Sequence, residues 1–143
     1  MNAAQKKVIR VLKSANNMNC LDWAIDCNKR LNLHLDLFIE TWERKMAGEN
    51  LLYLSGGMTN VPNFKENFNE AEKWLSNIYD VVNPAKYLFD ISWYEYMEID
   101  LSVLNLCNEI FMLDGWEYSR CAIIEHTKAK QYGINVMYES VNL

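Results

Sequence analysis

One aspartate falls on the side of a helix that should be apolar. The residues from Trp93 to Leu106 repeat with helical periodicity, and at about 100° per residue their polar side chains share one arc of roughly 80°, formed by Glu95, Glu98, Ser102 and Asn105. Asp100 points the opposite way, among Trp93, Tyr96, Met97, Leu101 and Leu104. Because an isolated ionised carboxylate there would cost several kcal/mol, Asp100 must be neutral, paired or exposed to a cleft. It is either a candidate acid or base, or a structural carboxyl with a hydrogen-bonded partner.

A second candidate carboxyl belongs to Glu125, in a helix predicted for residues 120–132. Ser119, Ala122 and Glu125 are spaced i, i+3 and i+6, so they share a face, with Ser119 at or near the N-cap. A phosphate could bind the Ser119 hydroxyl and the free N–H groups of the first turn, with Arg120 adding positive charge. The small Ala122 would leave room for a ligand above Glu125. Taken alone, Glu125 could also be an ordinary solvated glutamate.

Two turns carry the remaining candidates. The first contains Tyr53, Ser55, Gly56, Gly57 and Met58. Its two glycines let backbone N–H groups approach a ligand closely, which suits a phosphate or a sugar hydroxyl. Ser-Gly-Gly is also an ordinary turn, and it lacks the spacing of a dinucleotide fingerprint or a P-loop lysine. The second turn contains Asp114, Trp116 and Tyr118, whose aromatic rings either pack against the protein or, for an exposed Trp116, stack on a base.

An α/β fold beginning near residue 51 would position these side chains. Short apolar runs typical of strands alternate with segments of helical periodicity. The predicted strands are 51–54, 81–82, 109–113 and 134–138, and the predicted helices are 63–78, 93–106 and 120–132. This alternation predicts a parallel, flavodoxin-like or Rossmann-like sheet of four to five strands flanked by helices. Ligands of such sheets bind beyond the carboxyl ends of the strands, where both turns should meet.

The first fifty residues have a different pattern, with helical stripes and no strand candidate. The third stripe consists of Leu35, Phe38, Ile39, Trp42 and Met46, and Gly48 ends its helix. We therefore predict an all-helical N-terminal extension over residues 1–50 and an α/β domain over residues 51–143. The extension could pack on the domain or on a sister subunit, cover a ligand as a lid, or bind a partner. In the helix 63–78, the predicted core stripe is Phe64, Phe68, Ala71, Leu75 and Ile78.

Composition and charge exclude several function classes. The 143 residues carry a net charge of −5, divided as +2 over residues 1–50 and −7 over residues 51–143. The larger part would repel a polynucleotide, because such binding needs clustered cations. No apolar run approaches a membrane span and the N-terminus lacks the apolar core of a signal peptide, which favours the cytoplasm. The four cysteines have no C-x-x-C spacing and the two histidines lie far from a ligand set, so we expect neither a metal nor a cofactor.

Several motifs resemble the nucleoside 2-deoxyribosyltransferase superfamily. They are Tyr53-Leu-Ser-Gly-Gly-Met58, Asn83-Pro84, Trp93-Tyr-x-Tyr-Met97 leading to Asp100-Leu101, and Met112-Leu-Asp-Gly-Trp-Glu-Tyr-Ser119 with Ala122 and Glu125. The resemblance covers about residues 51–138 and includes the order and spacing of the motifs. The chain looks most like a small, largely uncharacterised branch common in phages, and a better-understood relative is the 2′-deoxynucleoside 5′-phosphate N-hydrolase.

The resemblance implies roles for individual residues. Glu125 matches the nucleophile that attacks the anomeric carbon of the deoxyribose, and Tyr53 matches the tyrosine that orients it. Asp100 matches the aspartate that handles the proton of the base, and Ser119 matches a phosphate contact. Cys121 departs from the pattern, because relatives usually have a glycine there that lets the sugar approach closely. The hydrolase's arginine-rich first loop is also absent, since residues 58–62 contain no cation.

The implied reaction is cleavage or transfer at the N-glycosidic bond of a (deoxy)nucleoside or its 5′-monophosphate. Asp100, with its pKa raised by apolar surroundings, would protonate the leaving base while ionised Glu125 attacks C1′ to give a covalent glycosyl-enzyme. This is the logic of a retaining glycosidase. Tyr53 would hold Glu125, the glycine turn would take the sugar or phosphate, and Trp116 or Met58 could contact the base.

Two other functions fit the same residues. The protein could bind or sequester a nucleotide without turning it over, and the departure from the family pattern at Cys121 is consistent with that function. It could also be a structural protein with a vestigial pocket. The expected partner is a small nucleoside or nucleotide, and not a polynucleotide or a membrane. Relatives form dimers or larger assemblies, so the resemblance also implies a homo-oligomer, located in the host cytoplasm if the protein is encoded by a phage.

Overall fold

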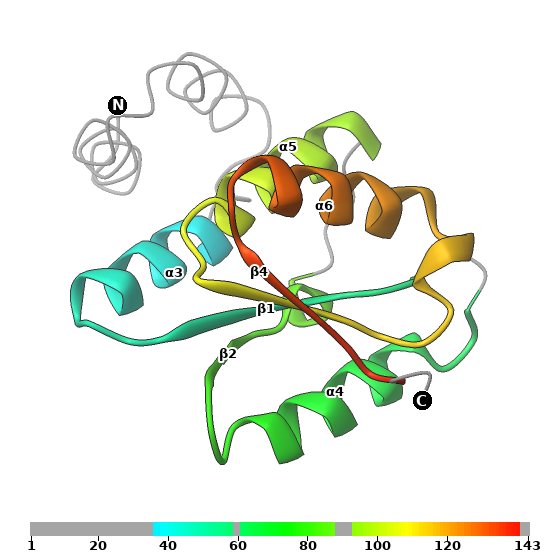
Figure 1. The fold of residues 1–143 in the computed structure, drawn as a ribbon, viewed down its shortest axis with the longest axis horizontal. Coiled ribbons are helices and arrows are strands. Elements are labelled where there is room, and N and C mark those ends of the chain that lie inside the picture. The colour runs from blue at the N-terminus through cyan, green and yellow to red at the C-terminus, as the bar shows by residue number, and fades with distance from the viewer. Residues whose placement is uncertain (1–35, 59–60, 88–92, 141–143) are drawn as a thin grey trace.

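A four-stranded parallel sheet forms the centre of the molecule (Figure 1). The computed structural model describes residues 36–58, 61–87 and 93–140, so the first two helical stripes of the N-terminal extension lie outside the described residues. The strands are β1 (Leu51–Ser55), β2 (Asp80–Val82), β3 (Glu109–Met112) and β4 (Asn135–Tyr138), in the order β2-β1-β3-β4. All three pairings are parallel. The predicted α/β fold with a parallel sheet is confirmed.

The helices form one layer on each face of this sheet (Figure 1). Helices α3 (Asp36–Met46), α5 (Trp93–Leu104) and α6 (Arg120–Gln131) cover one face, and α4 (Phe64–Leu75) covers the other. The chain moves one way along the sheet from β1 to β2 and the other way through β3 and β4, so right-handed crossovers leave α4 on the opposite face from α5 and α6. The direction therefore changes between β1 and β3, which is the position where such sheets bind ligands.

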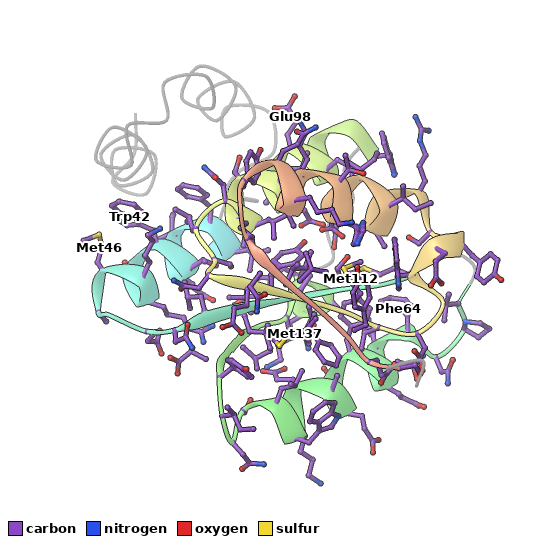
Figure 2. The ribbon with its side chains drawn as sticks, viewed as in Figure 1. Trp42, Met46, Phe64, Glu98, Met112 and Met137 are labelled. Carbon is purple, nitrogen blue, oxygen red and sulfur yellow. The ribbon has the colours of Figure 1, made fainter. Side chains whose placement is uncertain are left out.

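Alternation along the strands divides the core between the two faces. Tyr53 packs in the cluster under α3, α5 and α6, whereas its neighbours Leu52 and Leu54 pack in the cluster against α4. Met112 and Met137 likewise lie on opposite sides of the sheet (Figure 2). Since side chains two apart on a strand face the same way, Tyr53 and Ser55 both point toward α5 and α6.

Helix α3 packs against the α/β domain. Its buried residues Leu37, Phe38 and Ile39 belong to the same core cluster as β1 and α5. The Arg44 guanidinium donates a 2.8 Å hydrogen bond to the backbone carbonyl of Val81. The described part of the predicted extension is therefore anchored to the sheet by apolar packing and by polar contacts.

The structure corrects two predicted core residues. Ile78 is 73% exposed because α4 ends at Leu75, after which the Ile78 and Tyr79 N–H groups donate to the Leu75 carbonyl and turn the chain toward β2. Met46 is 64% exposed, and it points away from the fold at the last residue of α3 (Figure 2).

Two short 3₁₀ helices, η1 (Pro84–Lys86) and η2 (Trp116–Tyr118), complete the described elements. Asn83 caps η1, since its side chain accepts a hydrogen bond from the Ala85 N–H. Among the residues that the structure describes, no helix has both the length and the apolar character that crossing a membrane would require.

Candidate functional site

Glu125 is buried on α6 with both carboxylate oxygens hydrogen-bonded by residues of β1. The Ser55 hydroxyl donates to Oε1 over 2.8 Å, and the Tyr53 hydroxyl donates to Oε2. Both donors are themselves buried, so they hold the carboxylate in one orientation. Ser119 begins the helix, because its side chain accepts from the Ala122 N–H and satisfies one of the first-turn donors.

Asp100 is buried on α5 and lies beside the same tyrosine. Helix α5 sits between α3 and α6, which explains why its buried surface is wider than an amphipathic stripe and includes Ile99, Ser102 and Val103. Burial raises the pKa of Asp100 well above its ordinary value, the charge of Glu125 raises it further, and a hydrogen bond with Tyr53 opposes both effects. The sequence-predicted residues Asp100, Tyr53 and Glu125 are therefore brought together.

The two carboxyl groups differ in their affinity for a proton. Burial raises the pKa of Glu125 to about 7, with the hydrogen bonds from Tyr53 and Ser55 limiting the rise. The charge of Glu125 raises the pKa of Asp100, so a proton shared by the pair is held on Asp100 in preference to Glu125, whose pKa of about 7 leaves it ionised in a large fraction of molecules near neutral pH. A tyrosine hydroxyl has one proton to donate, so a protonated Asp100 can donate to Tyr53 while Tyr53 donates to Glu125. One neutral acid beside one carboxylate is the pairing that acid-assisted nucleophilic substitution needs.

Tyr96 is a fourth member of this cluster that sequence reasoning did not select. Burial raises the pKa of its hydroxyl, and the charges of Asp100 and Glu125 raise it further. The hydroxyl donates a 3.2 Å hydrogen bond to the Tyr87 carbonyl. Its spacing of four residues from Asp100 on α5 puts both on one side of the helix. That spacing is the signal that could have identified Tyr96 as more than a core residue.

The residues of the first turn have different surroundings. Ser55 is buried against Glu125 and is a positioning residue for the carboxylate. A Cβ added at Gly56 would lie 3.0 Å from the Leu113 Cβ, so a larger residue there would have to displace Leu113. Gly57 is half-buried at the edge of a cavity, and the partly buried Met58 packs on the core cluster facing α4.

The tryptophan of the second turn packs against a histidine of α6. The Trp116 ring stacks on His126 with centroids 4.3 Å apart and an interplanar angle of 29°, so it packs on the outer part of α6. The guanidinium of Arg120 lies 4.2 Å from the centre of the Trp93 ring. Asp114 donates its backbone N–H to Glu139 over 2.8 Å and lines the same cavity as Gly57.

Cys121 borders the carboxyl pair at one turn before Glu125. The Trp93 indole N–H donates to its sulfur over 2.9 Å. Burial raises the pKa of the thiol, and the charges of Glu125 and Asp100 raise it further. The half-buried thiol is therefore held by Trp93 close enough to both carboxyl groups to feel their charge.

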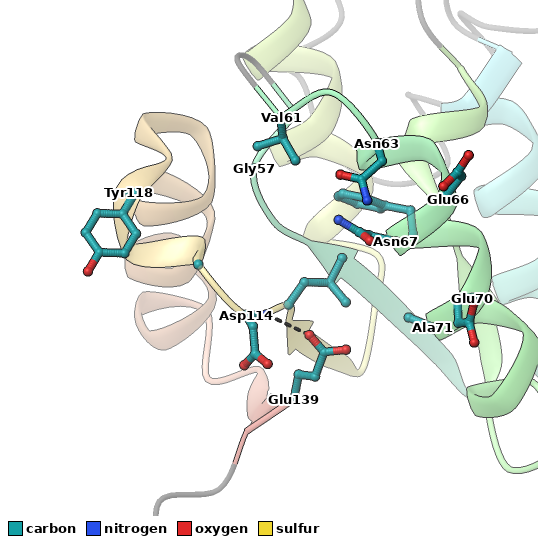
Figure 3. A pocket seen from close by; sticks show the side chains of 13 residues that line it. Gly57, Val61, Asn63, Glu66, Asn67, Glu70, Ala71, Asp114, Tyr118 and Glu139 are labelled. Carbon is teal, nitrogen blue, oxygen red and sulfur yellow. Dashed lines mark hydrogen bonds between the residues drawn. The ribbon is translucent and has the colours of Figure 1, made fainter.

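A cavity of about 660 Å³ lies at this end of the sheet, on the α4 face (Figure 3). Gly57 and Asp114 line it, but Tyr53, Asp100 and Glu125 do not. Among the described residues, no group of three or more His, Cys, Asp and Glu side chains has an arrangement that could hold a metal ion.

Comparison with known proteins gives one family and no closer relative. The model of a family described as a domain of unknown function, DUF4406, matches residues 50–138, which include all four strands and the carboxyl pair. No curated protein and no solved structure matches the chain. Because the family model spans more than half of its 143 residues, the chain belongs to the DUF4406 family.

Proposed function

We propose that the protein cleaves or transfers the N-glycosidic bond of a (deoxy)nucleoside or a nucleoside 5′-monophosphate. The observation that carries this proposal is the pair of buried carboxyl groups joined through one tyrosine hydroxyl, with the pKa of Asp100 raised well above its ordinary value and Glu125 able to ionise near neutral pH. The resemblance of the surrounding motifs to nucleoside 2-deoxyribosyltransferases agrees with this chemistry.

In the proposed mechanism, Glu125 forms a bond to C1′ as the bond between C1′ and the base nitrogen breaks. The electron pair of the broken bond goes to the leaving base, which takes a proton from Asp100. Water, or a second base, would then lose a proton to Asp100 and form a bond to C1′ as the bond between C1′ and Glu125 breaks, which returns the electron pair to the carboxylate. Tyr53 and Ser55 keep one Glu125 oxygen lone pair directed at the sugar by occupying others with hydrogen bonds.

A nucleotide-binding protein without turnover is the second candidate. Cys121 favours it, because a fixed thiol one turn from Glu125 restricts how closely a sugar can approach the carboxylate. In this reading the same residues would recognise the ligand, but the nucleophile and C1′ would not reach bonding distance.

A substrate panel separates the two candidates. The protein is incubated with the common nucleosides, 2′-deoxynucleosides and their 5′-monophosphates, and the products are separated by chromatography to detect free base. Free base, or exchange with a second base added to the reaction, is the expected result. Stoichiometric recovery of intact bound nucleotide, with no base released or exchanged, would refute the enzymatic proposal and support the binding protein.

A further inference from the structure

The cavity on the α4 face lies where the loops after β1 and β3 separate, at the carboxyl ends of the strands. Figure 3 shows Asp114 and Glu139 on one side of it and the first turns of α4 on the other, with Gly57 and Val61 at one end. A volume of about 660 Å³ is within the range of pockets that hold small organic ligands. Its location at the point where the chain direction changes is the usual ligand position in such sheets.

The walls of this cavity have one sign of charge. Phe68, Ala71 and Leu113 form an apolar floor, and the rim carries two amides and four carboxylates, from Asn63, Asn67, Glu66, Glu70, Asp114 and Glu139. The described lining contains no lysine or arginine. Arg120, at the start of α6, is stacked on Trp93, and residues 59–60 and 88–92 contain no basic residue. A phosphate group in this cavity would meet repulsion without a compensating cation.

The cavity lies beside the start of α6, the helix that carries Glu125. Gly57 lines the cavity, and a Cβ at this glycine would lie 3.7 Å from the Ser119 Cβ, so the two residues are in close proximity. Ser119 caps α6, and Glu125 follows six residues later, about 9 Å along the helix axis. Ser55, whose hydroxyl donates to Glu125, is separated from Gly57 by one residue, so the cavity begins close to the carboxylate.

We propose that this cavity receives the 5′ end of the ligand and that its charge selects nucleosides over nucleoside 5′-monophosphates. The inference rests on the proposed function and narrows its substrate class. A phosphate at about 8 Å from each carboxylate, screened by salt, loses about twofold in binding per carboxylate, and the four together correspond to a preference of about 16-fold for the uncharged 5′ hydroxyl. The preference should shrink as the ionic strength rises.

Calorimetric titration of the full chain tests this selection directly. Each of the four common 2′-deoxynucleosides and its 5′-monophosphate is titrated at low and at high salt. The same titrations are made with Glu70→Lys, which reverses one exposed charge of the rim, and with Glu98→Lys, which makes the same change at an exposed position on α5 that does not line the cavity (Figure 2). Glu70→Lys should reduce the preference for the nucleoside about fourfold, because one repulsive charge becomes attractive, and Glu98→Lys should leave it unchanged.

The outcomes also separate this inference from the proposed function. Tighter binding of nucleosides than of monophosphates, with a preference that Glu70→Lys reduces and Glu98→Lys does not, supports the selection. This holds even if no base is released and the proposed chemistry fails. Equal or tighter binding of the monophosphates overturns it, as does an equal response of the two variants or an absence of binding by every compound. Release of base from monophosphates in preference to nucleosides would keep the proposed function and overturn the selection.

Discussion

Replacing Glu125 by glutamine should make the protein more stable at high pH relative to wild type. The pKa of Glu125 rises from 4.5 to about 7 on folding, chiefly because the carboxylate loses water, and at about 1.4 kcal/mol per pKa unit this corresponds to about 3 kcal/mol. The folded state holds the proton more tightly than the unfolded state. The contribution of Glu125 to stability is therefore fully present below pH 4.5 and is lost between pH 4.5 and about 7.

Glutamine has no proton to lose, so Glu125→Gln should not show this loss. Its amide can still accept from Tyr53 and can donate to the Ser55 hydroxyl. The measurement is urea unfolding followed by tryptophan fluorescence at pH 4.5, 6 and 8. The free energy of unfolding of the variant, minus that of wild type, should increase by about 3 kcal/mol from the lowest to the highest pH. Glu66→Gln, at an exposed position, is the control and should parallel wild type. If Glu125→Gln also parallels wild type, or if the gap moves in the opposite direction, the reasoning about a buried, reluctantly ionised Glu125 is wrong.

Three further changes test individual parts of the site and the packing around it. Asp100→Asn should lower kcat/KM for base release by about 10²- to 10⁴-fold, the range of acid–base catalysis. It should also remove the fall in activity at high pH that wild type shows when Asp100 loses its proton. An unchanged pH–rate profile would contradict the role of Asp100 as the acid. Tyr53→Phe removes a hydrogen bond to a charged group, about 1.5–3 kcal/mol or ten- to a hundredfold in kcat/KM, and should move the rising limb of the profile above pH 7 because that bond lowers the pKa of Glu125. Gly56→Ala should destabilise by about 1–3 kcal/mol, since its Cβ would lie 3.0 Å from the Leu113 Cβ. Chemical denaturation of Gly56→Ala, with and without Leu113→Gly, which removes that Cβ, checks that the two sites interact.

Periodicity was sufficient to predict the sheet and the helices that contact it. Strand side chains alternate between two buried faces, and each helix has a buried stripe, so apolar spacing carries the information directly. Asp100 broke that spacing, and the structure shows that it is buried beside Tyr53 and Glu125. A buried carboxyl is detectable in a sequence because it occupies a position that apolar side chains otherwise fill.

Contacts between residues that are far apart in the sequence were harder to predict from the sequence. The hydroxyl of Ser55 reaches Glu125 because β1 packs under α6, and the register of that packing is a tertiary property. Trp116 stacks on His126 for the same kind of reason, although its place after a strand suggested contact with a ligand. Ile78 continued the helical spacing but followed the hydrogen-bonded turn that ends α4, and local backbone geometry took precedence over periodicity.

Base release by wild type and by Glu125→Ala, measured side by side, tests the central claim most directly. Both proteins are incubated with the compound of the nucleoside and monophosphate panel that wild type uses best, and free base is quantified by chromatography at pH 8, where wild-type Glu125 is ionised. We expect wild type to release base and the variant to be slower by about 10³-fold or more, because the nucleophile is absent. A variant that releases base at a rate close to wild type would contradict the assignment of Glu125 and, with it, the proposed mechanism.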